Sequence, residues 1–266
     1  MGTWGPGLYA NDVALDLRPT ITAVCRLPID AAEIIRLLVD LNPMSGDPGA
    51  DDHTTFWLVT ADLLHKRGIA SEATDRALAI IDDGSDLATL TTLGMGAGYL
   101  EQRVVVLGEL RDRLSTPPPV KRRRTLARPQ PLLVSPGEVH VFQIDERGRC
   151  YNPYFVKPQD AGFVPAAWRA CTVVDTGHAL GYLAWYQVAR SDRAWTDAPT
   201  LAQVLDEGGA GRVGVGTMPK NHMTRMGLRL VGTTTPPPVA SPTQDVTVRI
   251  TVNDISLSNV LSDWRA

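Results

Sequence analysis

The stretch from Ala170 to Val188, ACTVVDTGHALGYLAWYQV, is the apolar segment around which the second half of this 266-residue chain is expected to fold. It opens with the β-branched and small residues that strands prefer. The tetrapeptide Asp175-Thr176-Gly177-His178 then has the composition of a turn. We therefore expect a central β-hairpin in which residues 170–175 pair with residues 180–188.

The second strand of this hairpin is apolar on both faces. Tyr182, Ala184 and Tyr186 share one side, and Leu183 and Trp185 share the other. A strand of this kind is covered on both sides by other parts of the protein. Nine of the chain's 16 aromatic residues fall between residues 151 and 195. Since each can bury ~150–250 Å², this segment is expected to anchor a hydrophobic core.

Further strands and helices are predicted around the hairpin. They are a strand over 139–144, a short helix capped by Thr200, a strand over 246–252, and a last helix carrying Leu257, Val260, Leu261 and Trp264. The strand over 246–252 alternates as a half-buried strand does, and the last helix follows i, i+3, i+4, i+7 spacing. Residues 132–266 therefore predict an antiparallel-sheet domain with flanking helices.

Residues 1–115 contain a series of apolar stripes at helical spacing. Residues that cap helices precede these stripes at Asn11-Asp12, Asp30, Asp51-Asp52 and Ser71. Gly68 and Gly84 are placed to end two of the helices, and Pro19 is expected to interrupt or kink the first one. We therefore expect an N-terminal all-α helical bundle, so that the whole chain belongs to the α+β class.

Residues 116–131, TPPPVKRRRTLARPQP, form the boundary between the two predicted domains. Five prolines disfavour helix and favour extended polyproline conformations. The basic run of Arg122, Arg123 and Arg124 is of a kind that can bind nucleic acid. The alternative is a solvated linker lying near the acidic first domain, and it is favoured because no aromatic residue stands among the basic ones to stack on bases.

Charge is unevenly distributed along the chain, although its formal total is only −3. Residues 1–116 carry 9 Lys/Arg and 17 Asp/Glu, a net charge of −8, whereas residues 132–266 carry 12 of each kind. An acidic first domain favours a basic protein partner over nucleic acid.

The cysteines and the N-terminus indicate the cellular compartment in which the protein is expected to function. Cys25, Cys150 and Cys171 are odd in number and widely spaced, which is typical of free thiols in a reducing compartment. The N-terminus lacks the basic and apolar regions of a signal peptide, and no apolar run approaches the ~20 residues that span a bilayer. We therefore expect a cytoplasmic protein with no membrane segment.

The sequence contains no recognisable catalytic or metal-binding motif. The five histidines lie apart from one another, so neither a metal nor another cofactor is predicted. The glycine-rich stretch 209–216 lacks the Gly-Lys-Ser/Thr ending of a phosphate-binding loop. Asp175 and His178, at the predicted turn, are the best candidates for an orienting acid and a general base. The alternative is an Asx-type turn residue beside a surface histidine.

Two pairs of acidic residues stand at the ends of predicted helices. Asp51-Asp52 lies at a helix start, where the helix dipole favours negative charge. Asp82-Asp83 lies at a helix end, where the dipole opposes it. This second pair is less easily explained by folding, so we expect Asp82 and Asp83 to contact a partner, with Trp185 and Tyr186 as aromatic anchors.

Several N-terminal segments together resemble a known pattern. The matching residues are Met1-Gly2-Thr3-Trp4-Gly5, Gly7, Asn11-Asp12, Ala14, Asp16, Phe56-Trp57-Leu58 and Arg76-Ala77-Leu78-Ala79-Ile80-Ile81-Asp82. They resemble a bacterial family of unknown function whose members open MG-(T/A)-WG-x-G, continue ND-x-A-x-D, and carry an FWL helix followed by an RAL-x-II-D helix. The resemblance covers about the first 115 residues. Such families are suspected to contain immunity proteins that neutralise bacterial toxins, and the resemblance implies that role here.

Three hypotheses for function follow. The first is a cytoplasmic, non-enzymatic protein-binding module of the immunity type with a basic partner. The second is an enzyme acting on a small molecule in the aromatic-rich second domain, with Asp175 and His178 near its site. The third is a nucleic-acid-associated protein that uses residues 121–128. We favour the first because the first domain is acidic and no catalytic constellation is recognisable.

Overall fold

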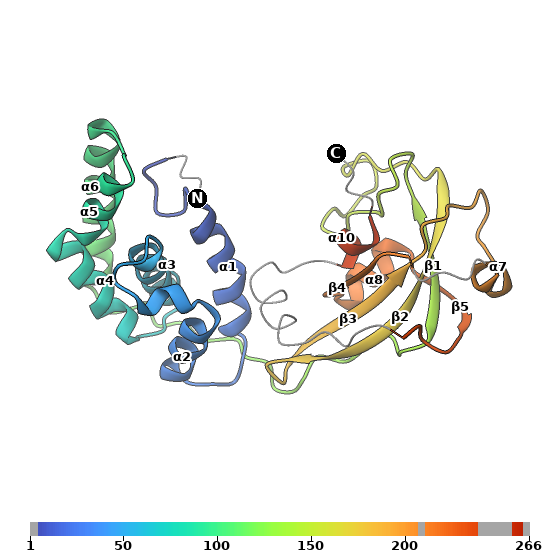
Figure 1. Ribbon diagram of the computed structural model, residues 1–266. Coiled ribbons are helices and arrows are strands. Elements are labelled where there is room, and N and C mark those ends of the chain that lie inside the picture. The colour runs from blue at the N-terminus through green and yellow to red at the C-terminus, as the bar shows by residue number, and fades with distance from the viewer. Residues whose placement is uncertain (1–4, 207–210, 239–256, 263–266) are drawn as a thin grey trace. The chain divides into compact units, whose positions relative to one another are not determined.

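The computed structural model describes residues 5–206, 211–238 and 257–262 (Figure 1). The chain divides into two compact units, with the boundary between Ala127 and Arg128. Helices make up the first unit and an antiparallel sheet the core of the second. The α+β class predicted from the sequence is therefore confirmed.

The first unit contains α-helices and one short 3₁₀ helix. They are α1 (Asp12–Val24), α2 (Ala31–Leu41), η1 (Pro43–Gly46), α3 (His53–Lys66), α4 (Glu72–Asp83), α5 (Ser85–Thr92) and α6 (Ala97–Leu114). Helix α3 is buried along most of its length, including Phe56, Trp57 and Leu64, and it forms the centre of this unit's core. Helices α1, α4, α5 and α6 pack against it.

Two of the predicted capping residues make the expected bonds. The Asn11 side chain accepts a hydrogen bond from the Ala14 amide at 2.7 Å, and Asp30 accepts one from the Glu33 amide at 2.8 Å. Pro19 does not interrupt the first helix, because α1 runs through this residue to Val24. Because proline has no amide hydrogen, Pro19 leaves the carbonyl of Leu15 without its helical hydrogen-bond donor. Leu15 is 44% exposed, so solvent can donate to this carbonyl instead.

The segment that follows α6 lies on the helical unit. Lys121 Nζ donates to the carbonyl of Lys66 at 2.7 Å, and the Leu126 amide donates to that of Arg26 at 2.8 Å. Gly68 permits this close approach, since a Cβ on it would lie 2.4 Å from the Pro119 carbonyl oxygen. The segment that contains the basic run, predicted as a linker, therefore lies along the C-terminal ends of α1 and α3.

The second unit is built on a five-stranded sheet. Its strands are β1 (Glu138–Ile144), β2 (Ala167–Ala179), β3 (Leu183–Arg190), β4 (Val213–Gly216) and β5 (Arg229–Thr233). Their spatial order is β4-β3-β2-β1-β5, and every neighbouring pair is antiparallel. Figure 1 shows β2 and β3 as the long central strands of this sheet.

The predicted turn at residues 175–178 is wrong, because β2 continues to Ala179. The chain reverses at Leu180 and Gly181, which both take positive φ, and the Tyr182 amide donates to the Ala179 carbonyl as in a type I′ turn. Gly177 has another role. It lies opposite Trp185 in the ladder, and a Cβ on Gly177 would come within 2.6 Å of the indole.

The sheet is covered on both faces, as the apolar character of β3 predicts. On one face Phe142, Tyr186 and Val188 pack with residues of α8 (Lys220–Met226) and α10 (Leu257–Leu261). On the other, Val141, Ala170 and Trp195 pack with Val204 of α7 (Leu201–Leu205). Thr200 caps α7 with a reciprocal capping box, as expected. The predicted strand over 246–252 and Trp264 lie outside the described residues.

Candidate functional site

Asp175 and His178 do not form a pair. Because they are three residues apart on the regular part of β2, their side chains leave opposite faces of the sheet. His178 Nε2 lies 2.7 Å from the carbonyl oxygen of Gln130, and the Asp175 carboxylate accepts a hydrogen bond from the Thr176 amide at 2.8 Å. The structure therefore does not bring the predicted acid and base together.

Trp185 and Tyr186 also lie on opposite faces of the sheet, since they are consecutive residues of β3. Tyr186 is fully buried and its hydroxyl accepts a hydrogen bond from the Leu133 amide at 3.0 Å. Burial raises the pKa of Tyr186. Trp185 is half-buried over Gly177. Tyr186 is thus a core residue, while Trp185 keeps part of its side chain at the surface.

The acidic pair Asp82 and Asp83 has local structural partners. Asp82 forms an ion pair of 3.0 Å with Arg111 of α6. The Asp83 carboxylate accepts a hydrogen bond from the Ser85 amide at 2.8 Å. Hydrogen bonding from the Ser85 side chain and from this amide lowers the pKa of Asp83. Since α5 begins at Ser85, Asp83 stands at a helix start as well as at a helix end. The dipole argument for a partner at this pair therefore does not hold.

The basic run divides into a structural residue and exposed ones. The Arg123 guanidinium donates hydrogen bonds to the carbonyls of Cys25, Leu27 and Ile29, just after α1. Arg122 and Arg124 are exposed. Arg123 is therefore engaged in fixing the connection between α1 and α2, a role that its position in the sequence did not reveal.

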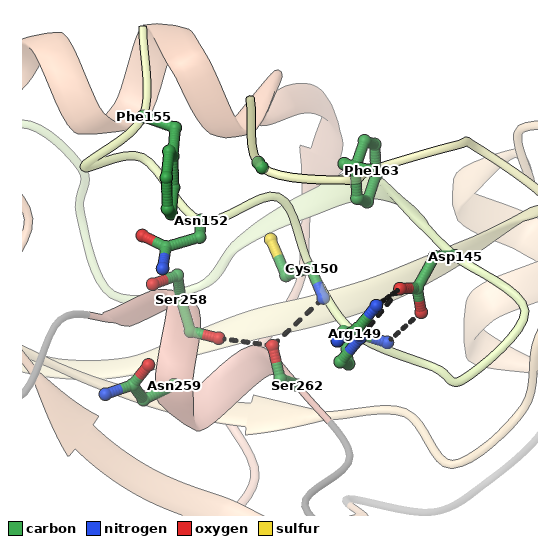
Figure 2. A pocket seen from close by; sticks show the side chains of 10 residues that line it. Asp145, Arg149, Cys150, Asn152, Phe155, Phe163, Ser258, Asn259 and Ser262 are labelled. Carbon is green, nitrogen blue, oxygen red and sulfur yellow. Dashed lines mark hydrogen bonds and ion pairs between the residues drawn. The ribbon is translucent and has the colours of Figure 1, made fainter. Parts of the chain in front are cut away.

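A cavity of about 110 Å³ in the second unit contains cysteine and serine side chains (Figure 2). The Cys150 amide donates to Ser262 Oγ at 2.9 Å, and Ser262 Oγ donates to the Ser258 carbonyl at 2.7 Å. Burial raises the pKa of the Cys150 thiol far above its usual value and that of Cys171 to about 12. Neither thiol is therefore activated as a nucleophile.

The acid at the edge of this cavity is also satisfied by its neighbours. Asp145 accepts hydrogen bonds from the amides of Arg147 and Arg149 and from the Arg149 guanidinium, at 3.0, 2.8 and 2.7 Å. Burial works to raise the pKa of Asp145, but these hydrogen bonds outweigh it and lower the pKa. Figure 2 shows Asp145 and Arg149 turned toward each other. This arrangement holds a turn in place, and it is not an acid prepared for proton transfer.

A hollow of about 760 Å³ on the helical unit lies between α2 and α4. We call it the α2–α4 groove, and its lining residues are Ala31, Ala32, Ile35, Arg36, Val39, Asp40, Gly46, Trp57, Ser71, Glu72 and Arg76. Its α2 side is one helical stripe, since its residues recur every three to four positions. The sequence did not reveal this site because its lining combines residues of α2, α3 and α4, and their proximity is not visible in sequence spacing.

Charged side chains form the rim of the α2–α4 groove. Arg36 bridges Glu33 at 2.5 Å and Asp40 at 2.9 Å, and Arg76 pairs with Glu72 at 3.7 Å. The Arg76 guanidinium also lies 4.4 Å from the centre of the Trp57 ring. The Trp57 indole is itself fixed, since its Nε1 donates to the Ser45 carbonyl at 3.1 Å. An apolar floor with charges at its edges is the usual form of a protein-binding groove.

The described residues contain neither a metal-binding cluster nor a membrane-spanning helix. Residues 5–206, 211–238 and 257–262 contain no group of three or more His, Cys, Asp or Glu side chains that could hold a metal ion. In the same part of the chain, no helix combines the length and apolar character needed to cross a bilayer.

Comparison with known proteins gives no relative from which function could be transferred. No family model matches the chain, and neither curated proteins nor solved structures yield a match. What the protein does must therefore be inferred from its own residues.

Proposed function

We propose that this protein is a protein-binding module whose α2–α4 groove receives an amphipathic segment of a basic partner. The observation that carries the proposal is the groove itself, about 760 Å³, with Ile35 and Trp57 in its floor and Val39 half-buried in its wall. An amphipathic helix places apolar residues every three to four positions, which suits an elongated apolar groove between two helices.

Exposed carboxylates at the groove can pair with a basic partner. Asp40 and Glu72 line the groove in equal number with Arg36 and Arg76, and Glu33 pairs with Arg36 from outside the lining. These ion pairs are exposed, so each contributes little to folding and can be exchanged for a pair with a partner. Basic residues flanking the apolar face of the partner would meet these acids, which favours fast association and correct orientation.

A toxin is the narrower identity that we propose for the partner. It is supported by the resemblance of residues 1–115 to a bacterial family with suspected immunity proteins. A module of this type neutralises its partner by covering it. The three free cysteines are buried, which fits the reducing cytoplasm as the compartment.

The proposal is tested by recovery of the partner with a pair of matched variants. The full chain serves as bait in a lysate of the organism that encodes it, beside Val39→Asp in the groove and Val105→Asp on the exposed side of α6. We expect wild type and Val105→Asp to recover the same basic protein, and Val39→Asp to lose it. Equal recovery by all three folded forms would contradict a role for the groove.

The toxin identity has its own test. Expression of the recovered protein alone should arrest growth of a bacterial host, and co-expression of the wild-type chain should restore it. Val39→Asp should fail to restore growth, whereas Val105→Asp should succeed. A recovered protein that is harmless on its own would contradict the toxin identity and leave the binding module intact.

A further inference from the structure

We propose that the cavity lined by Phe155 and Phe163 in the second unit receives a leucine-type side chain from a polypeptide ligand. Figure 2 shows this cavity from close by, and its lining comes from the loop after β1 and from α10 with the residue that follows it. Its volume is about 110 Å³, and it is open to solvent. Because the site lies in the sheet unit, its binding can be measured independently of the α2–α4 groove.

The charges in the lining of this cavity cancel each other. The charged residues of the described lining are Asp145 and Arg149, and the Arg149 guanidinium contacts the Asp145 carboxylate at 2.6 and 2.7 Å. The Asp145 carboxylate also accepts hydrogen bonds from two amides of its own turn. Neither residue therefore has a charge to spare for a ligand, and an unpaired charge is costly to bury. The ligand group that enters the cavity is therefore uncharged.

The walls and the size of the cavity favour an aliphatic group. Its apolar surface comes from the rings of Phe155 and Phe163 and from the buried thiol of Cys150, and Figure 2 shows the two rings and the sulfur around the same space. Aromatic rings and sulfur make favourable contacts with apolar groups. An apolar cavity of ~150 Å³ holds a benzene ring, so about 110 Å³ suits a smaller branched group such as the leucine side chain.

Asn152 is placed to bind the peptide backbone beside such a side chain. It lines the cavity, and its Oδ1 accepts a hydrogen bond from the Tyr154 amide at 3.1 Å, which orients the side-chain amide. Within the described ranges, Asn152 Nδ2 makes no hydrogen bond. Since this nitrogen carries two donor hydrogens, it can donate to a backbone carbonyl of the ligand.

Exposed apolar side chains adjoin the residues that line the cavity. Tyr154 and Val156 flank Phe155 in the sequence, and Val164 follows Phe163. Val156 is 72% exposed and Val164 is 73% exposed. Exposed apolar residues that gather in one segment are typical of an interaction surface. A free amino acid would leave these side chains uncovered, whereas a stretch of polypeptide would cover them.

The loop that carries this surface is fixed by contacts within itself and with α8. The Tyr151 hydroxyl donates to the Phe155 carbonyl at 2.7 Å, and the Tyr151 ring packs edge-on against Phe163 with 5.5 Å between the ring centres. Arg225 of α8 donates to the Pro153 carbonyl at 2.8 Å. A surface that is ordered before the ligand arrives loses less conformational entropy on binding. These contacts therefore prepare the loop for a ligand.

The test is an NMR titration of the ¹⁵N-labelled full chain with N-acetyl-leucine-methylamide as the probe. We expect the largest shifts at the amides of Cys150, Phe155 and Phe163. N-acetyl-alanine-methylamide lacks most of the apolar side chain and should bind at least ~10-fold more weakly. Free leucine should also bind at least ~10-fold more weakly, because its ammonium and carboxylate groups meet no spare charge in the described lining.

Two matched alanine substitutions separate the cavity from the rest of the loop. Ala161→Leu places a larger side chain in the lining and should weaken binding of the probe at least ~10-fold, because the space is then filled. Ala166→Leu makes the same change at an exposed position outside the lining and should leave the affinity unchanged. Equal affinity for the leucine and alanine compounds, or equal weakening by the two variants, would overturn the inference.

Other occupants of the cavity would give different results. Free leucine that binds as tightly as the probe would assign the cavity to a free amino acid and overturn the inference. Shifts of the same amides when the labelled chain alone is concentrated would assign the surface to a second copy and also overturn it. The groove variant Val39→Asp should bind the probe as the wild type does, so failure of the cavity and failure of the proposed function remain distinguishable.

Discussion

At the scale of single residues, the buried carboxylate of Asp62 joins three separate segments of the helical unit. It accepts hydrogen bonds from the Tyr9 hydroxyl, from Lys66 Nζ at 2.7 Å and from Arg113 Nε at 3.0 Å. Asp62 is fully buried. Burial alone would raise the pKa of Asp62, but hydrogen bonds from Lys66 and Tyr9 and the nearby cations lower it. This carboxylate therefore attaches the N-terminal segment and α6 to α3.

Replacing Asp62 by Asn should destabilise the protein by about 2–4 kcal/mol, because the amide cannot satisfy two cations and a phenol at once. The free energy of unfolding in urea measures this loss. Asp82→Asn breaks an exposed ion pair of similar length and should change the unfolding free energy little. If Asp62→Asn and Asp82→Asn lowered the unfolding free energy by similar amounts, the buried Asp62 network would contribute no more to stability than an exposed ion pair.

The same carboxylate predicts a dependence of stability on pH. Because the folded-state pKa of Asp62 is lowered, its contribution is complete above the unfolded value of about 4 and is lost as the pH falls through the folded value. Stability of the wild type should therefore decline below about pH 4. Urea unfolding between pH 3 and 7 should show a shallower decline for Asp62→Asn, and parallel curves would contradict the assignment.

At the scale of elements, Arg123 closes the C-terminal end of α1. Its three bonds go to the carbonyls of Cys25, the C-cap of α1, and of Leu27 and Ile29 in the connection to α2. Arg123→Gln should lower the unfolding free energy by about 2–3 kcal/mol, since these bonds come from a charged donor. Arg124→Gln, at an exposed neighbour, should have little effect. Equal effects would indicate that the run acts only through its total charge.

Gly177 fixes how Trp185 packs on the β2–β3 hairpin. A methyl group at Gly177 would meet the indole at 2.6 Å, so Gly177→Ala should cost about 1–3 kcal/mol through overpacking and change the tryptophan fluorescence. Gly108→Ala, in the interior of α6 with nothing within 4 Å of an added Cβ, should instead stabilise by about 0.5–1 kcal/mol. Stabilisation by both substitutions would exclude the packing role of Gly177.

The elements that could be predicted are those whose causes are local. Asn11 and Asp30 cap their helices through bonds to residues three positions away, and such spacing is visible in the sequence. Gly177 was misjudged because its partner, Trp185, lies on the neighbouring strand. Asp83 was misjudged because the next helix begins immediately after Gly84. In each failure the deciding contact came from another element.

At the scale of the whole molecule, the division into helical and sheet units followed from composition and periodicity, but the candidate sites did not. The α2–α4 groove combines residues from several helices, and no sequence spacing records such proximity. The basic run also alters the charge of its surroundings. Because Lys121–Arg124 belong to the first unit, they reduce its net charge from −8 to −4.

Because the net charge of the first unit is small, the expectation of a basic partner depends on the individual acids near the binding site. The acids nearest the groove are Asp40 and Glu72, which line it, and Glu33, which pairs with Arg36. Interactions between exposed charges farther apart than ~8 Å are largely screened at physiological salt. A partner would therefore respond to these nearby carboxylates more than to the charge of the unit.

The affinity of the purified partner for three forms of the full chain tests the binding-module proposal most directly. Isothermal titration calorimetry would compare the wild type, Val39→Asp in the groove and Val105→Asp on α6. A residue at the centre of an interface contributes about 2 kcal/mol or more, so Val39→Asp should weaken binding by at least ~30-fold. Val105→Asp should stay within about twofold of the wild type. The same affinity for all three forms would contradict the proposal that the groove is the binding site.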